Sequence, residues 1–362
     1  MRIVHTETVE SLSGQPLRLI AEARALSAAG HACTVVGPAE TEFHRRAAEG
    51  IDFRPFRFAK RDPRSLARAR RLLSELAPDV VHTHSSRDAW LFGLAARSLG
   101  IPIVRGRHIA RALPRSFLSR LVYTRLADAF TASGETIARM LVEARVAKPE
   151  AVWVTPAGID FERFDARARD PAALRAELGL DPRARLVGTT CNRRAQKGVG
   201  TLLDAFCELE DESAVLLVAG KGDPAPLAAR AGRAGGRVRF LGFRDDIERV
   251  LGALELFVLA SSSDEGVPQA ILQAMALRVP VLATRAGGIP DVVRAGETGF
   301  LVPPDDARAL STAMRGLLAV PPPEAVLDSA WNLVRDTCSL DAVVARYLEA
   351  YAYARNCATS ES

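Results

Sequence analysis

Short apolar runs alternate with longer amphipathic segments along most of this 362-residue chain, and this alternation constrains the fold more than any other feature. In the first half, the apolar runs have the length and the β-branched content of strands, and the segments between them have helical spacing. The expected strands are RIVHT, ACTVVG, DVVHTH, IPIVRGRH, AFTAS and AVWVTP, and the expected helices include QPLRLIAEARALSAAG, PRSLARARRLLSELA and DAWLFGLAARSLG.

The same alternation starts again in the second half. Its expected strands are RLVGTT, AVLLVAG, VRFLGF, LFVLAS and VPVLAT, separated by the helical segments GVGTLLDAFCEL, DDIERVLGAL and VPQAILQAMAL. Strands that alternate with helices through short connections form parallel, doubly wound sheets. The sequence therefore predicts an α/β protein with two Rossmann-like domains, which face each other across a cleft at the carboxyl ends of their strands.

A Pro/Gly turn and a polar stretch separate the two runs, and they place a linker at about residues 156–184. We expect an N-terminal, acceptor-binding domain over residues 1–165 and a donor-binding domain over residues 166–340. The last helical segment, residues 341–362, has no strand after it and could pack back on the first domain.

The composition favours a globular protein of the cytoplasm. Hydrophobic residues make up 48% of the chain and charged residues 25%, which excludes a disordered chain. No apolar run reaches the length of a membrane span, and the stretch MRIVHTETVES lacks the pattern of a signal peptide. The five cysteines are scattered without a Cys-x-x-Cys pair, which argues against a disulfide framework or a zinc site.

Positive charge is concentrated in the first half of the chain. Residues 1–165 carry a net charge of +7 and the remainder −2, with the densest cluster at residues 53–73. Together with RALPRSFLSRLVYTR, this cluster mixes cations with Phe, Leu and Tyr. It predicts either contact with an anionic membrane surface or an ordinary solvated, Arg-rich face.

An acidic pair, Asp264 and Glu265, stands directly before the helix expected near Val267. Pro268 suits the first turn of a helix, and the amides of residues 269–271 would lack intrahelical partners and form an anion site. Glu265 could accept hydrogen bonds from sugar hydroxyls, and Gln273 could bind another hydroxyl pair. The alternative is that the acidic pair only caps the helix and complements its dipole.

The stretch DEGVPQAILQAMALRVPVLATRAGGIPDVV resembles the signature of the family 4 retaining glycosyltransferases, which have the GT-B fold. Glu265 matches the first Glu of that pattern, whereas the second is Gln273 here, a departure that bears on ribose binding. The resemblance implies that the donor nucleotide-sugar contacts the segment that follows Glu265, namely Gly266, Val267, Gln269, Ala270, Ile271 and Gln273.

The segment NRRAQKGVGTLLDAF is similar to the Arg…Lys-Gly segment of the same family, whose cations bind the donor diphosphate. Lys197 matches the Lys, but Asn192 stands at the usual Arg position, so that Arg193 or Arg194 would replace it. A cation at a strand-to-helix junction suits a leaving diphosphate; otherwise Lys197 is a solvated surface residue.

Further family positions fall on other strand ends. Gly14 and Gln15 resemble the first glycine loop, and Gly220, Phe243 and Arg244 fall in segments that the family places near the donor's phosphates and base. His108 matches a histidine that contacts the sugar near the reacting carbon, and with Glu265 and Lys197 it makes up the expected catalytic set. The acceptor-binding candidates are His84, Arg87 and Arg111; isolated histidines are otherwise mostly structural.

These features together predict a retaining glycosyltransferase that moves a sugar from a nucleotide-diphosphate sugar, expected to be a UDP-sugar, to an acceptor hydroxyl. The acceptor would be a cell-envelope glycolipid or polysaccharide such as lipopolysaccharide. The sequence has no Asp-x-Asp triplet, so we expect no metal and no cofactor. The alternatives are a GT-B nucleotide-sugar epimerase and a weakly active or non-catalytic nucleotide-sugar-binding partner subunit. We expect no binding of nucleic acid.

Overall fold

The computed structural model describes the 362-residue chain except residues 60–62, 114–115, 191–196 and 361–362. The chain divides into two compact units: Met1–Gly158 with Leu340–Ser362 form unit 1, and Ile159–Ser339 form unit 2. The division therefore lies within the expected linker region but before residue 165. Among the helices of the described ranges, none combines the length and the apolarity needed to cross a bilayer.

Unit 1 is built on a parallel sheet of seven strands in the order β3-β2-β1-β4-β5-β6-β7. Adjacent strands run parallel throughout, for example Val81 beside Ile103 and Phe130 beside Val152. The strands are β1 (Arg2–Thr6), β2 (Ala32–Gly37), β3 (Asp52–Pro55), β4 (Val80–Thr83), β5 (Ile103–Arg107), β6 (Ala129–Ala132) and β7 (Val152–Val154).

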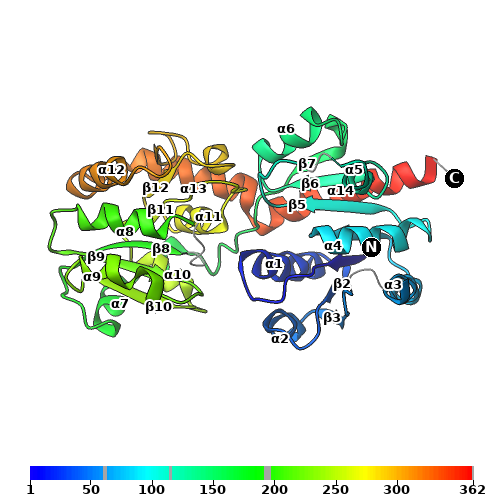
Figure 1. The fold of residues 1–362 in the computed structure, drawn as a ribbon, viewed down its shortest axis with the longest axis horizontal. Helices are drawn as coiled ribbons and strands as arrows, with labels where there is room; N and C mark the ends of the chain where they lie inside the picture. The colour runs from blue at the N-terminus through cyan, green and yellow to red at the C-terminus, as the bar shows by residue number, and fades with distance from the viewer. Residues whose placement is uncertain (60–62, 114–115, 191–196, 361–362) are drawn as a thin grey trace. The chain divides into compact units, whose positions relative to one another are not determined.

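Helices cover both faces of this sheet. The core on one face combines β1 and β2 with α1 (Gly14–Ala28) and the C-terminal helix α14 (Leu340–Ser360), and Figure 1 shows α14 lying along β5, β6 and β7. The core on the other face includes residues of α3 (Pro63–Leu76) and α4 (Ser86–Arg97). The remaining helices are α2 (Glu42–Ala48), α5 (Phe117–Thr124), α6 (Glu135–Glu143) and the 3-10 turn Pro149–Ala151.

Unit 2 repeats the design with six strands in the order β10-β9-β8-β11-β12-β13. They are β8 (Arg185–Thr190), β9 (Ala214–Ala219), β10 (Val238–Gly242), β11 (Leu256–Leu259), β12 (Val281–Thr284) and β13 (Phe300–Val302). The helices are α7 (Pro171–Glu177), α8 (Val199–Cys207), α9 (Ala228–Gly232), α10 (Ile247–Gly252), α11 (Gln269–Ala276), α12 (Ala307–Ala319) and α13 (Glu324–Cys338), with 3-10 turns at Ala166–Ala168, Ala225–Leu227 and Ile289–Asp291.

Both sheets change winding direction next to their first strand. In unit 1 the first strand, β1, lies between β2 and β4; in unit 2, β8 lies between β9 and β11. Such switch points leave a crevice at the carboxyl ends of the strands, where open α/β sheets bind ligands. The predicted site residues follow β1, β4 and β5 in unit 1 and β8 to β11 in unit 2, so that the topology brings each set to one edge of its own sheet.

Candidate functional site

Glu265 lies in the loop that joins β11 to α11 and is buried, with 8% of its surface exposed. One of its carboxylate oxygens, Oε1, accepts hydrogen bonds from Lys197 Nζ at 2.6 Å and from Ser261 Oγ at 2.7 Å. The Ser261 side chain is fully buried. A carboxylate that leaves water needs such partners, so Lys197 and Ser261 hold Glu265 in one place.

The Gly-Gly pair that follows β12 packs directly on the backbone of Glu265. Gly287 has a φ of +53°, and a Cβ at this position would lie 2.3 Å from the carbonyl oxygen of Glu265. The amide of Gly288 donates to that same oxygen at 2.9 Å. The glycines therefore allow a second loop to fix the segment that carries the acidic residue.

The helix α11 begins two residues later than the sequence indicated. Pro268 has an extended backbone (φ −70°, ψ 125°) and precedes the first helical residue, Gln269, because a proline suits the entry to a helix but need not lie within it. The expectation that three amides lack partners was wrong for Ile271, whose N–H donates to the carbonyl of Pro268 at 3.1 Å. Within the described residues, the amides of Gln269 and Ala270 have no partner and keep the anion-binding character.

The other residues predicted around this helix differ in exposure. Gly266, Val267 and Ile271 are buried, whereas Gln269, Ala270 and Gln273 are half-buried. The apolar side chains of Val267 and Ile271 pack in the interior of unit 2, so these two residues offer a ligand mainly their backbone.

Lys197 precedes α8, and the residue after it is a glycine that the structure requires. Gly198 has a φ of +65°, and a Cβ there would lie 1.7 Å from the carbonyl oxygen of Ala260, at the end of β11. This close approach of two loops brings Lys197 to Glu265 across 68 residues of sequence. Arg193 and Arg194, together with Asn192, lie outside the described residues.

The predicted residues after β9 and β10 lie at a neighbouring pair of strand ends. The amide of Gly220 donates to the carbonyl of Gly242 at 2.6 Å. The side chain of Phe243 is 37% exposed, and Lys221 Nζ lies over its ring, 4.8 Å from the centroid. Arg244 pairs with Glu177 at 2.7 Å and with Asp246 at 2.7 Å. Its guanidinium is thus occupied by carboxylates, which leaves its backbone for any contact with a base.

In unit 1, the predicted histidines His84 and His108 lie against each other. His84 Nδ1 is 3.1 Å from His108 Nε2, and the two rings are stacked. Gly106 makes this contact possible, since a Cβ there would lie 2.9 Å from His108 and 3.0 Å from His84. His84 is buried and His108 is half-buried.

The loop after β1 is held by a carboxylate that sequence reasoning missed. Glu7 is fully buried and accepts the amides of Thr8 and Val9 at 2.6 and 3.0 Å. The predicted Gln15 donates to Glu7 and also to the carbonyl of His84 at 3.2 Å, so its amide braces the loop. Gly14 is the exposed first residue of α1.

The other two acceptor-binding candidates lie on the surface of unit 1. Arg87 and Arg111 are exposed, and the carbonyl of Arg111 accepts a hydrogen bond from Arg107. Exposed arginines suit contact with an anionic surface better than a defined pocket.

Burial controls the ionisation of the histidines in unit 1. It lowers the pKa of His5 to about 3 and places the pKa of His82, His84 and His108 well below the usual 6.5. The positive charge of Arg18 adds to the effect at the last three. These rings are therefore neutral at physiological pH.

Ring nitrogens of His5, His82 and His84 lie within 4.8 Å of one another, a spacing that a metal ion could use. These ring nitrogens already have hydrogen-bond partners. His5 Nδ1 lies 2.9 Å from His84 Nε2, and His82 contacts the hydroxyls of Tyr351 and Thr131 at 2.9 and 3.0 Å. Hydrogen bonding accounts for this cluster.

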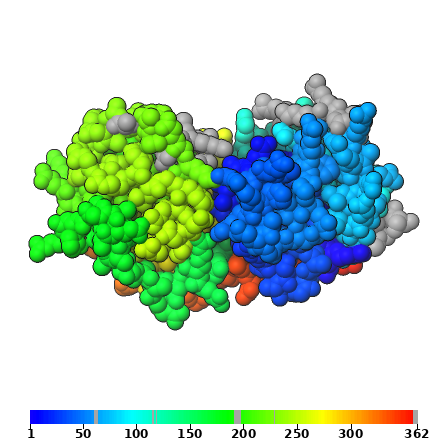
Figure 2. Space-filling model, turned by 90° about the horizontal axis from the view of Figure 1, so that it is seen from below, coloured from blue at the N-terminus to red at the C-terminus, as the bar shows by residue number. Residues whose placement is uncertain are grey.

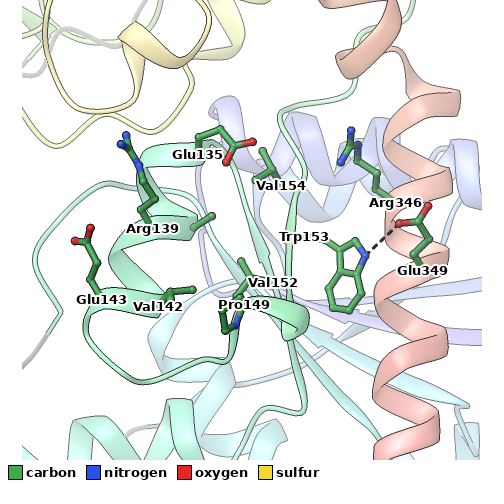
Figure 3. A pocket seen from close by; sticks show the side chains of 11 residues that line it. Glu135, Arg139, Val142, Glu143, Pro149, Val152, Trp153, Val154, Arg346 and Glu349 are labelled. Atoms are coloured by element: carbon green, nitrogen blue, oxygen red, sulfur yellow. Dashed lines mark hydrogen bonds between the residues drawn. The ribbon is translucent and has the colours of Figure 1, made fainter.

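A separate cavity of about 640 Å³ opens in unit 1 along the free edge of β7, between α6 and α14 (Figure 3). Trp153 lies in it and donates to Glu349 at 3.1 Å. None of the predicted site residues lines this cavity, whose walls also carry Glu135, Arg139 and Arg346.

Two segments of the chain match known family models. Residues 13–163 match the family model described as Glycosyltransferase Family 4, and residues 182–319 match the model described as Glycosyl transferases group 1. Both units contain glycosyltransferase domains. The matches agree with the glycosyltransferase resemblance noted in the sequence, and the residues from Lys197 to Gln273 lie within the second of them.

Curated relatives of the chain are found in bacteria and plants. It is 32% identical over 266 residues to the D-inositol 3-phosphate glycosyltransferase of Mycobacterium sp. (strain JLS), covering 67% of this chain and 59% of that protein. It is 28% identical over 300 residues to the sulfoquinovosyl transferase SQD2 of Arabidopsis thaliana, covering 76% and 58%. The match thus spans about three fifths of the length of these relatives.

Solved structures show the same fold over nearly the whole chain. Anabaena HepE in complex with UDP and glucose superposes with a TM-score of 0.84 at 20% identity, covering 96% of this chain and 98% of that one. WaaG, a glycosyltransferase involved in lipopolysaccharide biosynthesis, gives 0.72 at 16% identity, with 96% and 98% covered. The predicted GT-B fold, with two Rossmann-like domains, is confirmed.

Proposed function

We propose that this protein is a retaining glycosyltransferase that transfers a sugar from a nucleotide-diphosphate sugar, a UDP-sugar in our proposal, to an acceptor hydroxyl. The observation that carries the proposal is the ion pair between Lys197 and Glu265 beside the start of α11. At the switch point of unit 2, a cation and a carboxylate thus lie beside the amides of Gln269 and Ala270, which have no partner among the described residues. HepE, a structure of similar fold, was solved with UDP and glucose.

The chemistry that this set suits is departure of a diphosphate. As the bond between the sugar's anomeric carbon and the phosphate oxygen breaks, negative charge grows on the leaving oxygens. Lys197 and the amides of Gln269 and Ala270 would stabilise that charge, which is the largest single contribution in many transfer reactions. Glu265 would orient Lys197 and accept hydrogen bonds from sugar hydroxyls.

Retention follows if the acceptor enters on the face that the diphosphate leaves. The acceptor oxygen then bonds to the anomeric carbon while its proton passes to the departing phosphate oxygen, so that no protein base is needed. Hydrolysis by two flanking carboxylates requires a different arrangement. We propose that cations and amides replace a divalent metal here, and activity should therefore persist in EDTA.

Removal of Lys197 tests the function directly. Lys197→Ala is expected to lower kcat for sugar transfer by about 10²–10³-fold, as the loss of one preorganised donor does elsewhere. Lys148, which is exposed and lies in unit 1, provides a matched control, and Lys148→Ala should keep full turnover. Turnover of Lys197→Ala close to the wild-type value would overturn the assignment.

For the acceptor we propose a cell-envelope glycolipid or polysaccharide, such as lipopolysaccharide, that binds unit 1 at the inner face of the cell membrane. Four arginines of α3 are exposed: Arg64, Arg68, Arg70 and Arg71. Phe117, at the start of α5, is 74% exposed. Figure 2 looks onto the surface that α2, β3 and α3 form in unit 1, drawn in blue. Exposed cations and an exposed aromatic ring on the same unit suit an anionic lipid surface.

Sedimentation with vesicles tests the membrane contact. Wild-type protein should pellet with vesicles that contain phosphatidylglycerol at low salt and should be released as salt screens the charges. Arg68→Gln combined with Phe117→Ser should reduce the bound fraction several-fold. Absence of binding at low salt would remove the membrane proposal and leave the transferase proposal standing.

Two other functions are alternatives to sugar transfer. Gln273 and Asn192 stand where family members usually carry Glu and Arg, which would suit a weakly active or non-catalytic nucleotide-sugar-binding partner subunit. The other alternative is a nucleotide-sugar epimerase of the same fold. Product analysis separates them: transfer without epimerisation excludes the epimerase, and a large gain of activity in Gln273→Glu would favour a weakened enzyme.

A further inference from the structure

A continuous series of hydrogen bonds runs from α1 into the core of unit 1 through three histidines. Arg18 Nη1 lies 3.3 Å from His108 Nδ1, and His108 Nε2 lies 3.1 Å from His84 Nδ1. His84 Nε2 in turn lies 2.9 Å from His5 Nδ1, and His5 Nε2 lies 3.5 Å from the hydroxyl of Tyr351. Each ring thus uses one nitrogen toward each neighbour.

The guanidinium at one end gives the series a direction, because an arginine can donate hydrogen bonds but cannot accept them. His108 Nδ1 must therefore be the acceptor, and the proton of the neutral ring lies on Nε2. That proton points to His84 Nδ1, so His84 also carries its proton on Nε2 and donates to His5. The same logic places the proton of His5 on Nε2, toward Tyr351.

The direction extends beyond Tyr351. Its hydroxyl, which accepts from His5, is free to donate to His82 Nδ1 at 2.9 Å. The His82 proton then lies on Nε2 and points to Thr131 Oγ1 at 3.0 Å. One obligate donor therefore determines the tautomer of four histidines.

Arg18 cannot easily turn away from this role. The side chain is buried, with 6% of its surface exposed. Its Nε donates to Glu22 at 2.7 Å, and its Nη2 donates to the carbonyl of Thr155 at 2.8 Å and to the hydroxyl of Tyr347 at 2.9 Å. The remaining nitrogen, Nη1, is the one that reaches His108.

We propose that Arg18 is a positioning residue that acts through His108: it holds that ring in the neutral Nε2–H form and so directs the whole histidine series. The consequence for substrate rests on the proposed function. His108 Nε2 is committed to His84, so the acceptor atom Nδ1 is the one that a sugar hydroxyl can share with Arg18. A sugar hydroxyl that binds His108 must then donate its proton to Nδ1.

The charges around His108 agree with a neutral ring. Arg18 faces it from α1, His84 from the loop after β4 and Arg107 from β5. Tyr347 and Tyr351 of α14 line the series without charge. The carboxylate near this end, Glu22, is engaged by Arg18, Tyr347 and the amide of Gly158. A doubly protonated His108 would place a donor against Arg18.

Nitrogen-15 NMR of the wild-type protein tests the proposal without any assay of activity. Long-range correlations from ring protons distinguish the two nitrogens, and the chain has six histidines, so that single His→Gln variants assign the signals. We expect His5, His82, His84 and His108 in the Nε2–H form from pH 6 to pH 8. The proposal would be overturned if His108 carried its proton on Nδ1, exchanged between the two tautomers or was doubly protonated. Binding of one zinc ion per chain at His5 and His84 would overturn it as well.

A pair of variants then tests the part played by Arg18. Arg18→Met is combined with Glu22→Gln, because the single change would leave Glu22 buried without its cation; Glu22→Gln alone is the control. The double variant should show an averaged His108 tautomer and a roughly tenfold to hundredfold loss of kcat/KM, and Arg18→Lys with Glu22 intact should recover part of it. An unchanged tautomer in the double variant contradicts the proposal.

The proposed tautomers and the proposed function can be contradicted independently of each other. If no nucleotide binds but the four tautomers are as expected, the histidine series stands and the transferase proposal falls. Should the double variant not fold, the wild-type spectrum alone decides.

Discussion

Gly198 and Gly316 show how differently one residue type is used in this chain. Gly198 has a left-handed backbone against the carbonyl of Ala260, whereas Gly316 lies in the exposed part of α12 with nothing within 4 Å of an added Cβ. The first glycine is required by a close approach of two loops, and the second only weakens a helix.

The two glycines should therefore respond to alanine with opposite signs. Gly198→Ala is expected to lower the free energy of unfolding by at least about 2 kcal/mol, since the left-handed conformation alone costs roughly 1–2 kcal/mol and Ala260 must also move. Gly316→Ala should raise it by about 0.5–1 kcal/mol. Urea denaturation of both variants measures the difference, and a neutral Gly198→Ala would contradict the described loop contact.

Glu7 makes stability depend on pH. Burial raises its pKa from 4.5 to about 8, with the charge of Asp88 adding to the effect. Between these values the folded state keeps a proton that the unfolded state has lost, so raising the pH favours unfolding.

In Glu7→Gln this pH dependence should disappear. From pH 5 to pH 8 the free energy of unfolding of the wild type should fall, relative to the variant, by more than about 1 kcal/mol, given that one unit of pKa shift corresponds to about 1.4 kcal/mol. Urea denaturation at intervals of one pH unit provides the data. A constant difference between the two proteins would show that Glu7 is ionised throughout.

Sequence patterns predicted the positions of the site residues better than their partners. Lys197 and Glu265 were expected near the same strand ends, but nothing in the sequence indicates that they form an ion pair or that Ser261 supports it. Arg18 lies within an amphipathic helix and looks like a solvated cation. Its role depends on His108 and Tyr347, which are 90 and 329 residues away.

Secondary-structure elements with a strong apolar pattern were predicted well. ACTVVG and RLVGTT coincide with β2 and β8. The strands β3 (DFRP) and β13 (FLV) were missed, because the first is polar and largely exposed and the second has only three residues. An edge strand buries too little surface to leave a periodic pattern.

The C-terminal helix α14 belongs to the core of unit 1. Tyr351 is fully buried and joins the core with α1, β1 and β2. Tyr353, two residues later, is half-buried and contacts the ring of Trp153 with centroids 5.2 Å apart. Helical spacing directs these two tyrosines to different surroundings.

Truncation of these tyrosines should therefore separate the two faces of the helix. Tyr351→Ala is expected to lower the free energy of unfolding by about 3–5 kcal/mol through the cavity that it leaves, and Tyr353→Ala by less than about 2 kcal/mol. Equal losses in chemical denaturation would contradict the packing of α14 on the sheet.

At the scale of the whole molecule, the two runs of alternating elements were enough to predict the fold class. They were not enough to predict where the chain passes from one unit to the other. Residues after Ile159 already pack in unit 2: Phe164 is buried, and Arg169 donates to the carbonyl of Gly252 at 2.7 Å. From sequence alone, this polar stretch after Ile159 has the pattern of a linker, although single residues in it make tertiary contacts with unit 2.

Thermal unfolding with nucleotide ligands tests the central claim, that unit 2 binds a nucleotide-diphosphate sugar through Lys197 and the start of α11. A ligand that binds only the folded state raises the melting temperature as its concentration exceeds Kd. The panel is UDP, GDP, ADP, CMP and dTDP with their common sugars, measured on wild type, Lys197→Ala and Lys148→Ala. We predict stabilisation by one nucleotide diphosphate, UDP in our proposal, in wild type and Lys148→Ala and its loss in Lys197→Ala; stabilisation of none of the three proteins would contradict the account.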